Sequence, residues 1–243
     1  MRYKVVCAYD GNNYAGFQSQ KNALAIQDVI EDVLYQIFRE KIRIVMSSRT
    51  DAGVHAKGQV FHFDSDQEKD LYKLKYSFNS LLPKDIHVID IKKVSDKFHA
   101  RFSVKKKTYE YLINTGEYDV FLNGYAYQCF YKLDLDLMKK GAKLFEGIHD
   151  FSSFNTSSLK EYPNQVRNIY EFKITKRKDL IKITVTSTGF LRNMVRIMVG
   201  TLIDLGRGLK TLDDISNMLE KPQKNTRRFN ADPNGLYLKR IFY

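Results

Sequence analysis

The chain has 243 residues, of which 43% are hydrophobic and 13% aromatic, with 13 glycines and four prolines. A chain of this length and apolar content buries about 70–75% of its unfolded surface, so it needs neither metals nor disulfides to fold. The same composition excludes disordered, collagen-like and low-complexity proteins. The length allows one large domain or two smaller ones.

The charge is strongly positive, with 40 Lys and Arg against 28 Asp and Glu and a formal net charge of +12. Such a surplus favours a polyanionic partner, because neutralising phosphates releases counterions. The basic residues form clusters at 101–107, 139–140, 176–178 and 221–228. A lysine-rich solvated surface accounts for the charge equally well, so charge alone does not decide between the two interpretations.

Targeting and membrane signals are weak. The apolar start of the chain is too short for a signal peptide, and the best apolar stretch, 189–206, is interrupted by charged residues. Cys7 and Cys129 stand apart and form no CxxC motif. We therefore expect a cytoplasmic protein with reduced thiols and no membrane association.

Hydrophobic periodicity predicts strands alternating with helices. In the first half we expect strands at 3–9, 42–46, 59–63 and 86–91 and helices at 25–38 and 71–81. In the second half we expect strands at 107–113 and 124–131, a helix at 133–145, a hairpin of 170–174 with 181–185, a helix at 190–205 and a strand at 235–243.

These elements predict an α+β protein made of two related halves, residues 1–103 and 104–243. Alternating strands favour antiparallel or mixed sheets with one face covered by helices. The boundary is placed at the charged run 102–106. We expect a central basic cleft between the two halves.

The polar loop 47–58 is the stretch most suggestive of chemistry. Arg49, Thr50 and Asp51 follow a predicted strand and precede Ala52 and Gly53. A carboxylate beside a guanidinium and a hydroxyl on a sharp turn is suited to catalysis. On composition alone, a solvated turn remains the alternative.

The segment SRTDAGVHAKGQVFHF resembles the catalytic signature of the TruA family of transfer-RNA pseudouridine synthases. The segments YDGNNYAGFQSQ, FHARFSVKKKTYEYLI, HDFSSF, GFLRNMVRIMVGTLIDLGRG and ADPNGLYL resemble further family motifs in the same order. The chain departs from the family at Phe17, where a tryptophan is common, and at Ser48, where a glycine is common.

The resemblance implies an isomerase that breaks the N-glycosidic bond of a uridine and rejoins the base through carbon 5, without metal or cofactor. By motif match it implies Asp51 as the nucleophile. It implies Arg196 as the opposite charge that keeps this carboxylate ionised. It implies Tyr109 as the active-site tyrosine, whose ring stacks on the uracil and whose hydroxyl is a candidate for proton transfer at carbon 5. The spacing of Arg192 and Arg196 places both on the polar side of the predicted helix.

The resemblance also implies a substrate-binding set and the partners. Arg49 would help to extrude the target nucleotide, since the reacting atoms are hidden in a base stack. Thr50, Tyr109, Arg101 and Arg192 complete the set. The implied substrate is tRNA, at uridines 38–40 of the anticodon stem-loop, and the implied assembly is a homodimer.

Several alternatives stay open. The chain could be a paralogue that acts on another position or another RNA, or a non-catalytic RNA-binding protein of the same fold. The carboxylate could attack carbon 1′ or carbon 6, or assist a glycal route. A metallonuclease is disfavoured, because the five histidines are scattered without the spacing of a metal site.

Overall fold

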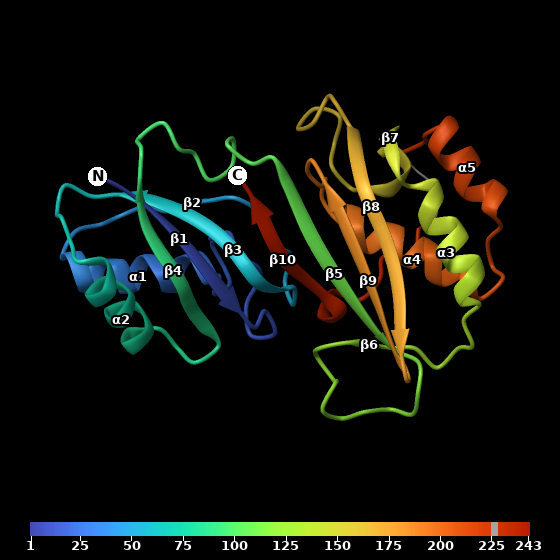
Figure 1. The fold of residues 1–243 in the computed structure, drawn as a ribbon, viewed down its shortest axis with the longest axis horizontal. Coiled ribbons are helices and arrows are strands. Elements are labelled where there is room, and N and C mark those ends of the chain that lie inside the picture. The colour runs from blue at the N-terminus through green and yellow to red at the C-terminus, as the bar shows by residue number, and fades with distance from the viewer. Residues whose placement is uncertain (225–227) are drawn as a thin grey trace. The chain divides into compact units, whose positions relative to one another are not determined.

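The computed structural model describes residues 1–224 and 228–243, which fall into two compact units (Figure 1). Unit 1 comprises Met1–Lys105 together with Tyr237–Tyr243, and unit 2 comprises Lys106–Leu236. The prediction assigned residues 104–243 to the second half. The C-terminal strand belongs to unit 1 because it pairs with a strand of that unit.

The sheet of unit 1 has the strand order β4 (Ile86–Val94), β1 (Arg2–Tyr9), β3 (His55–Asp64) and β10 (Leu236–Phe242), with β2 (Val45–Met46) also paired to β3. The strand β1 is antiparallel to both of its neighbours, whereas β10 runs parallel to β3. Alternate residues of β1 are buried, which is the period expected when helices cover one face of a sheet.

Two helices, α1 (Ile26–Phe38) and α2 (Leu71–Leu81), close the core of unit 1. Phe38 of α1 and Phe78 of α2 both contact the ring of Phe63 on β3, which stacks on Tyr3 of β1 at 5.0 Å. Both helices were predicted from their apolar spacing, and their positions are confirmed to within one residue.

The sheet of unit 2 has the order β5 (Lys106–Asn114), β9 (Leu180–Ser187), β8 (Val166–Arg177) and β7 (Gly147–Asp150), with β6 (Tyr127–Gln128) parallel to β5. The predicted hairpin is confirmed as β8 and β9. Among its described residues, unit 2 also has the α-helices α3 (Leu135–Leu144), α4 (Met194–Gly206) and α5 (Leu212–Glu220). The predicted α+β class with mixed sheets is therefore confirmed.

Several predicted boundaries were wrong. Within 42–46 only β2 pairs with another strand; Ile42 and Ile44 are buried without joining a ladder, so burial alone produced their alternation. Within 124–131 only β6 pairs, and Tyr125 and Phe130 are exposed. The strand β7 and the helix α5 were not predicted. Part of the basic cluster at 221–228, residues 225–227, lies outside the described residues.

The helix predicted from residue 190 begins only at Met194. Asn193, which precedes it, has a left-handed backbone with φ of +59°, and this conformation cannot continue a right-handed helix. Arg192 therefore lies in a turn and does not share a helix face with Arg196, contrary to the prediction. No helix in the described ranges is both long enough and apolar enough to cross a membrane.

Candidate active site

The loop 47–54 joins β2 to β3 in unit 1 and carries the candidate nucleophile. The Ser47 amide donates to the Val60 carbonyl at 2.8 Å, and the buried Gln59 side chain donates from Nε2 to the Ser48 carbonyl at 2.7 Å. The Val54 amide donates to the Asp51 carbonyl at 3.2 Å, which closes a turn around Asp51. The Asp51 side chain is half-buried on this turn.

Thr50 is anchored from inside the unit. Its hydroxyl is only 2.7 Å from the Tyr9 hydroxyl, and its carbonyl accepts from the Phe17 amide at 3.2 Å. Both Thr50 and Phe17 are buried. These contacts fix the backbone directly before Asp51, and a contact of Thr50 with substrate stays a prediction.

Two glycines of the YDGNNYAGFQ segment explain how that segment packs on the loop 47–54. A Cβ on Gly11 would lie 2.2 Å from the Val54 carbonyl oxygen, and one on Gly16 would lie 2.5 Å from the Thr50 carbonyl oxygen. Only glycine permits such close approach of two backbones. The YDGNNYAGFQ segment and the RTDAGVHA segment, which both resemble family motifs, thus pack against each other next to Asp51.

We expect the change Tyr9→Phe to lower the free energy of unfolding by about 1–2 kcal/mol, because it leaves the buried Thr50 hydroxyl without its partner. Urea denaturation measures this change. The matched control is Tyr35→Phe on α1, where the side chain is half-exposed and the change should cost almost nothing. Equal stability of the Tyr9 and Tyr35 variants would contradict the assigned role of the Tyr9 hydroxyl.

In unit 2, Tyr109 lies on β5 with its neighbour Tyr111 on the same face of the strand. Tyr109 is buried and packs edge-on against Phe190, with ring centroids 5.1 Å apart. Tyr111 is more deeply buried, and its hydroxyl donates to the Asp232 carbonyl at 2.7 Å. Burial, together with the charge of Asp232, raises the pKa of Tyr111 well above its usual value, so this hydroxyl stays protonated.

Arg196 lies in the first turn of α4 and is half-buried. Its Nε donates to the Ala231 carbonyl at 2.7 Å, and its own carbonyl accepts from the Ala231 amide at 3.2 Å. Arg196 and Tyr111 therefore hold the adjacent residues 231 and 232. A guanidinium in the first turn adds to the positive end of the helix dipole, which favours an anion at this place.

The remaining predicted binding residues are exposed. Arg49 lies on the loop before Asp51, and Arg192 lies in the turn before α4. The backbone of Arg192 is held by residues 156 and 157, because its amide donates to the Ser157 hydroxyl at 3.1 Å and its carbonyl accepts from the Thr156 amide at 3.0 Å. Arg101 follows β4 in unit 1, and its guanidinium lies 5.7 Å from the ring centre of Phe102.

The structure places Arg49, Thr50, Asp51 and Arg101 in unit 1, and Tyr109, Arg192 and Arg196 in unit 2. Sequence reasoning missed the residues that support them: Tyr9, Gln59, Tyr111 through its hydroxyl, and the backbone of residues 231–232. All of them lie within segments that resemble family motifs, but the motifs alone do not indicate these supporting contacts. Within the described ranges, no three His, Cys, Asp or Glu side chains gather as a metal site would require.

Similarity to known proteins establishes the family of this chain. The family described as tRNA pseudouridine synthase matches residues 5–103 and 142–243. The chain belongs to this family. The resemblance inferred from the motifs is thereby confirmed, and so is the enzyme class, an isomerase of the pseudouridine synthase type.

Relatives match along essentially the whole chain. The tRNA pseudouridine synthase A of Exiguobacterium sp. (strain ATCC BAA-1283 / AT1b) is 42% identical over 242 residues, covering 100% of this chain and 98% of its own. That of Thermoanaerobacter sp. (strain X514) is 39% identical over 240 residues, covering 98% of each chain. That of Geobacillus sp. (strain WCH70) is 40% identical over 244 residues, covering 100% of this chain and 98% of its own.

The two departures from the family motifs have simple structural accounts. Phe17 is fully buried and contacts the ring of Tyr9 at 5.8 Å, so an aromatic side chain is retained as a packing element. Ser48 is not among the residues with positive φ, so its backbone does not require glycine.

Proposed function

We propose that this protein isomerises uridine to pseudouridine in the anticodon stem-loop of tRNA, at positions 38–40, with Asp51 as the nucleophile. The observation that carries the proposal is the turn 50–54, which holds a half-buried carboxylate on a backbone fixed by Tyr9, Phe17 and Gln59. A nucleophile held in one geometry is what a reaction without a cofactor requires.

The reaction is balanced without an added reagent. The bond from N1 of the uracil to carbon 1′ breaks, the base turns, and carbon 5 bonds to carbon 1′ while its proton leaves and N1 gains one. Attack at carbon 1′, attack at carbon 6 and a glycal route all use the same carboxylate. In each route Asp51 must be ionised, which a nearby positive charge favours.

The other proposed roles follow from side-chain chemistry. By the resemblance, Arg196 is the positive charge that keeps Asp51 ionised, and its place in the first turn of α4 adds to the positive potential of that helix end. Tyr109 supplies a ring for stacking on the uracil. Arg49 is exposed and lies two residues before Asp51. We assign it a contact with the phosphate of the target nucleotide while the base leaves its stack. Arg192 contributes a further phosphate contact.

The experiment incubates the purified protein with a tRNA transcript in which every uridine, including those at positions 38–40, is tritiated at carbon 5. We expect tritium release, and pseudouridine mapping should place the product at these positions. A transcript with cytidine at 38–40 is the control and should release nothing. Addition of EDTA should leave the rate unchanged, because the proposed steps need no metal.

Each contrary result has a separate meaning. Tight binding without tritium release would overturn the isomerase proposal in favour of an RNA-binding protein. Equal release from the control transcript would overturn the assignment to positions 38–40 and leave the chemistry intact.

We also propose that the protein is a cytoplasmic homodimer, as the resemblance implies. Sedimentation of a monomer at assay concentrations would contradict the dimer.

A further inference from the structure

The segment 95–103, here called the 95–103 loop, follows β4 in unit 1 and carries an exposed aromatic side chain whose surroundings fix its position. Phe102 is 76% exposed. Exposure of one ring is common at protein surfaces, so the contacts that hold this ring are what distinguish it. The neighbouring Arg101 is also exposed.

The base of this loop is held by His62, a buried residue of β3. The Ala100 amide donates to His62 Nδ1 at 3.1 Å, and the imidazole packs edge-on against the rings of Phe98 and His99. Burial, with the charges of Arg2 and His99 adding to it, lowers the pKa of His62 to about 4. The imidazole is therefore neutral near pH 7, with Nδ1 free of a proton and able to accept.

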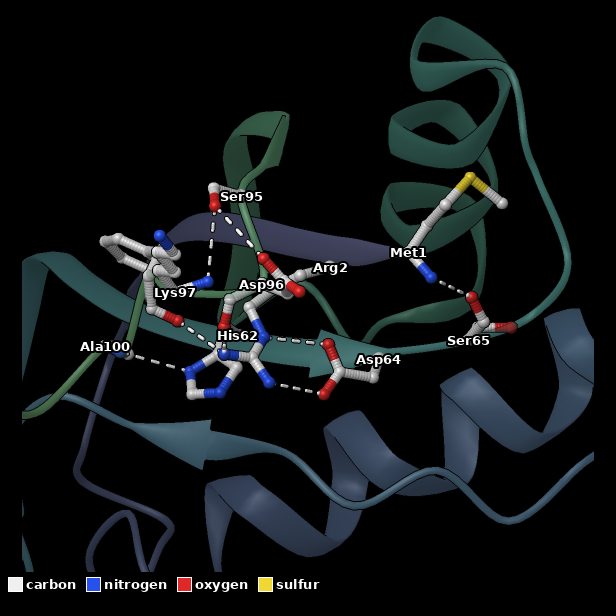
Figure 2. Close-up of polar contacts among 10 residues, drawn as sticks. Met1, Arg2, His62, Asp64, Ser65, Ser95, Asp96, Lys97 and Ala100 are labelled. Carbon is white, nitrogen blue, oxygen red and sulfur yellow. Dashed lines mark hydrogen bonds and ion pairs between the residues drawn. The ribbon is translucent and has the colours of Figure 1, made fainter.

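Arg2 of β1 holds the loop from a second direction (Figure 2). Its guanidinium binds both carboxylate oxygens of Asp64, at 2.8 and 2.7 Å. It also donates to the Phe98 carbonyl at 2.7 Å and to the Asp96 carbonyl. One planar group thus ties the end of β3 to the start of the 95–103 loop, which fixes the loop against the sheet.

Further contacts fix residues 99–102 of the loop. The Tyr243 hydroxyl donates to the Ala100 carbonyl at 2.8 Å. His99 Nδ1 accepts from the amides of both Arg101 and Phe102, at 3.1 and 3.3 Å. The His99 ring packs on the Phe102 ring at 4.3 Å with 32° between their planes. Phe102 is therefore an oriented ring, which contacts His99 and lies near the Arg101 guanidinium, and most of its surface is open to solvent.

The charge around this ring favours a nucleic acid over an apolar protein surface. Residues 95–105 include exposed Lys97, Arg101 and Lys105, with Asp96 as the one acidic residue of the segment. A second copy of the chain would bring the same positive charges together, which costs free energy. A base of RNA brings a flat ring with phosphates attached, which suits both the aromatic and the basic side chains.

We propose that Phe102 is a stacking platform for an unpaired base of the RNA substrate, and that His62 is the residue that positions it. This inference rests on the proposed function, because it takes RNA as the partner. A ring already fixed by its surroundings binds a base without the entropic cost of being ordered. The polar contacts of the 95–103 loop thus serve affinity as well as folding.

The first test measures affinity for the tRNA transcript in Phe102 variants. We expect Phe102→Ala to weaken binding about 5- to 150-fold, the range for loss of one base–aromatic stack. Phe102→Trp keeps a ring and should bind within about two-fold of the unchanged protein. The control is Tyr72→Ala on α2, which removes an 81% exposed ring from the same unit outside the 95–103 loop and should leave affinity unchanged.

The second test asks whether His62 acts through Phe102. His62→Phe keeps a ring and removes the acceptor, whereas His62→Asn keeps an acceptor near the position of Nδ1. We expect weakened binding in the first variant and near-normal binding in the second. Adding Phe102→Ala to His62→Phe should cost much less than it costs alone, since residues of one network are not additive.

The outcomes separate this inference from the proposed function. Normal affinity in Phe102→Ala, with tritium release intact in the unchanged protein, overturns the platform and leaves the proposed function standing. Full additivity in the double variant overturns the positioning role of His62. A dimer that dissociates in Phe102→Ala while RNA affinity per subunit is kept would show that a second copy covers the ring, which also overturns the inference. Urea denaturation of each variant verifies that it is folded.

Discussion

Replacing Asp51 with alanine is expected to abolish pseudouridine formation while tRNA affinity stays within about three-fold of the unchanged protein. Loss of a nucleophile that acts with other groups typically costs about 10⁴-fold or more in turnover. Affinity should survive because the contacts that fix the loop use the backbone and the side chains of Thr50, Tyr9 and Gln59. Tritium release under single-turnover conditions and a filter-binding assay measure the two quantities.

Asp51→Asn sharpens this test, because it keeps the shape of the side chain and removes the charge. We expect it to be as inactive as the alanine variant. Asp66→Asn, an exposed carboxylate change in the same unit, is the control and should retain full activity. Turnover above about 1% in either Asp51 variant would show that this carboxylate is not the nucleophile, whatever its effect on binding.

The sequence predicted some helices more accurately than others, and the reason is how each helix is packed. The helices α1 and α2 were predicted because each buries one stripe and exposes the other, so the spacing of apolar residues reports the helix directly. The start of α4 could not be found in this way. Leu191 is buried although it lies outside the helix, so the apolar pattern continues past the point where the left-handed Asn193 stops the helix.

The candidate site was predictable in its residue types but not in its supports. The RTDAGVHA segment indicates Asp51 as the nucleophile by resemblance. Nothing in the sequence predicts the contact between the hydroxyls of Tyr9 and Thr50, which lie 41 positions apart. The same applies to Gly11 and Gly16, whose importance lies in the backbone that approaches them. Such contacts depend on tertiary packing, which single-sequence periodicity does not encode.

The change Gly16→Ala should show how far the site depends on that packing. Gly16 has φ of +93°, and an added Cβ would lie 2.5 Å from the Thr50 carbonyl oxygen. The strained backbone costs about 1–2 kcal/mol, and the backbone clash adds about 1–3 kcal/mol. We expect the free energy of unfolding to fall by about 2–5 kcal/mol in total. A displacement of residues 50–52 by about 1 Å should also lower turnover about 100-fold.

Gly208→Ala is the matched control, because Gly208 also has a positive φ, of +75°, and a Cβ there would meet nothing within 4 Å. This variant carries only the backbone strain, so it should lose about 1–2 kcal/mol of stability and keep its turnover. The difference between the two variants isolates the contact of Gly16 with the loop that holds Asp51. If both lost stability equally and Gly16→Ala kept full turnover, the loop would tolerate displacement, and the argument that its fixed backbone orients the nucleophile would fail.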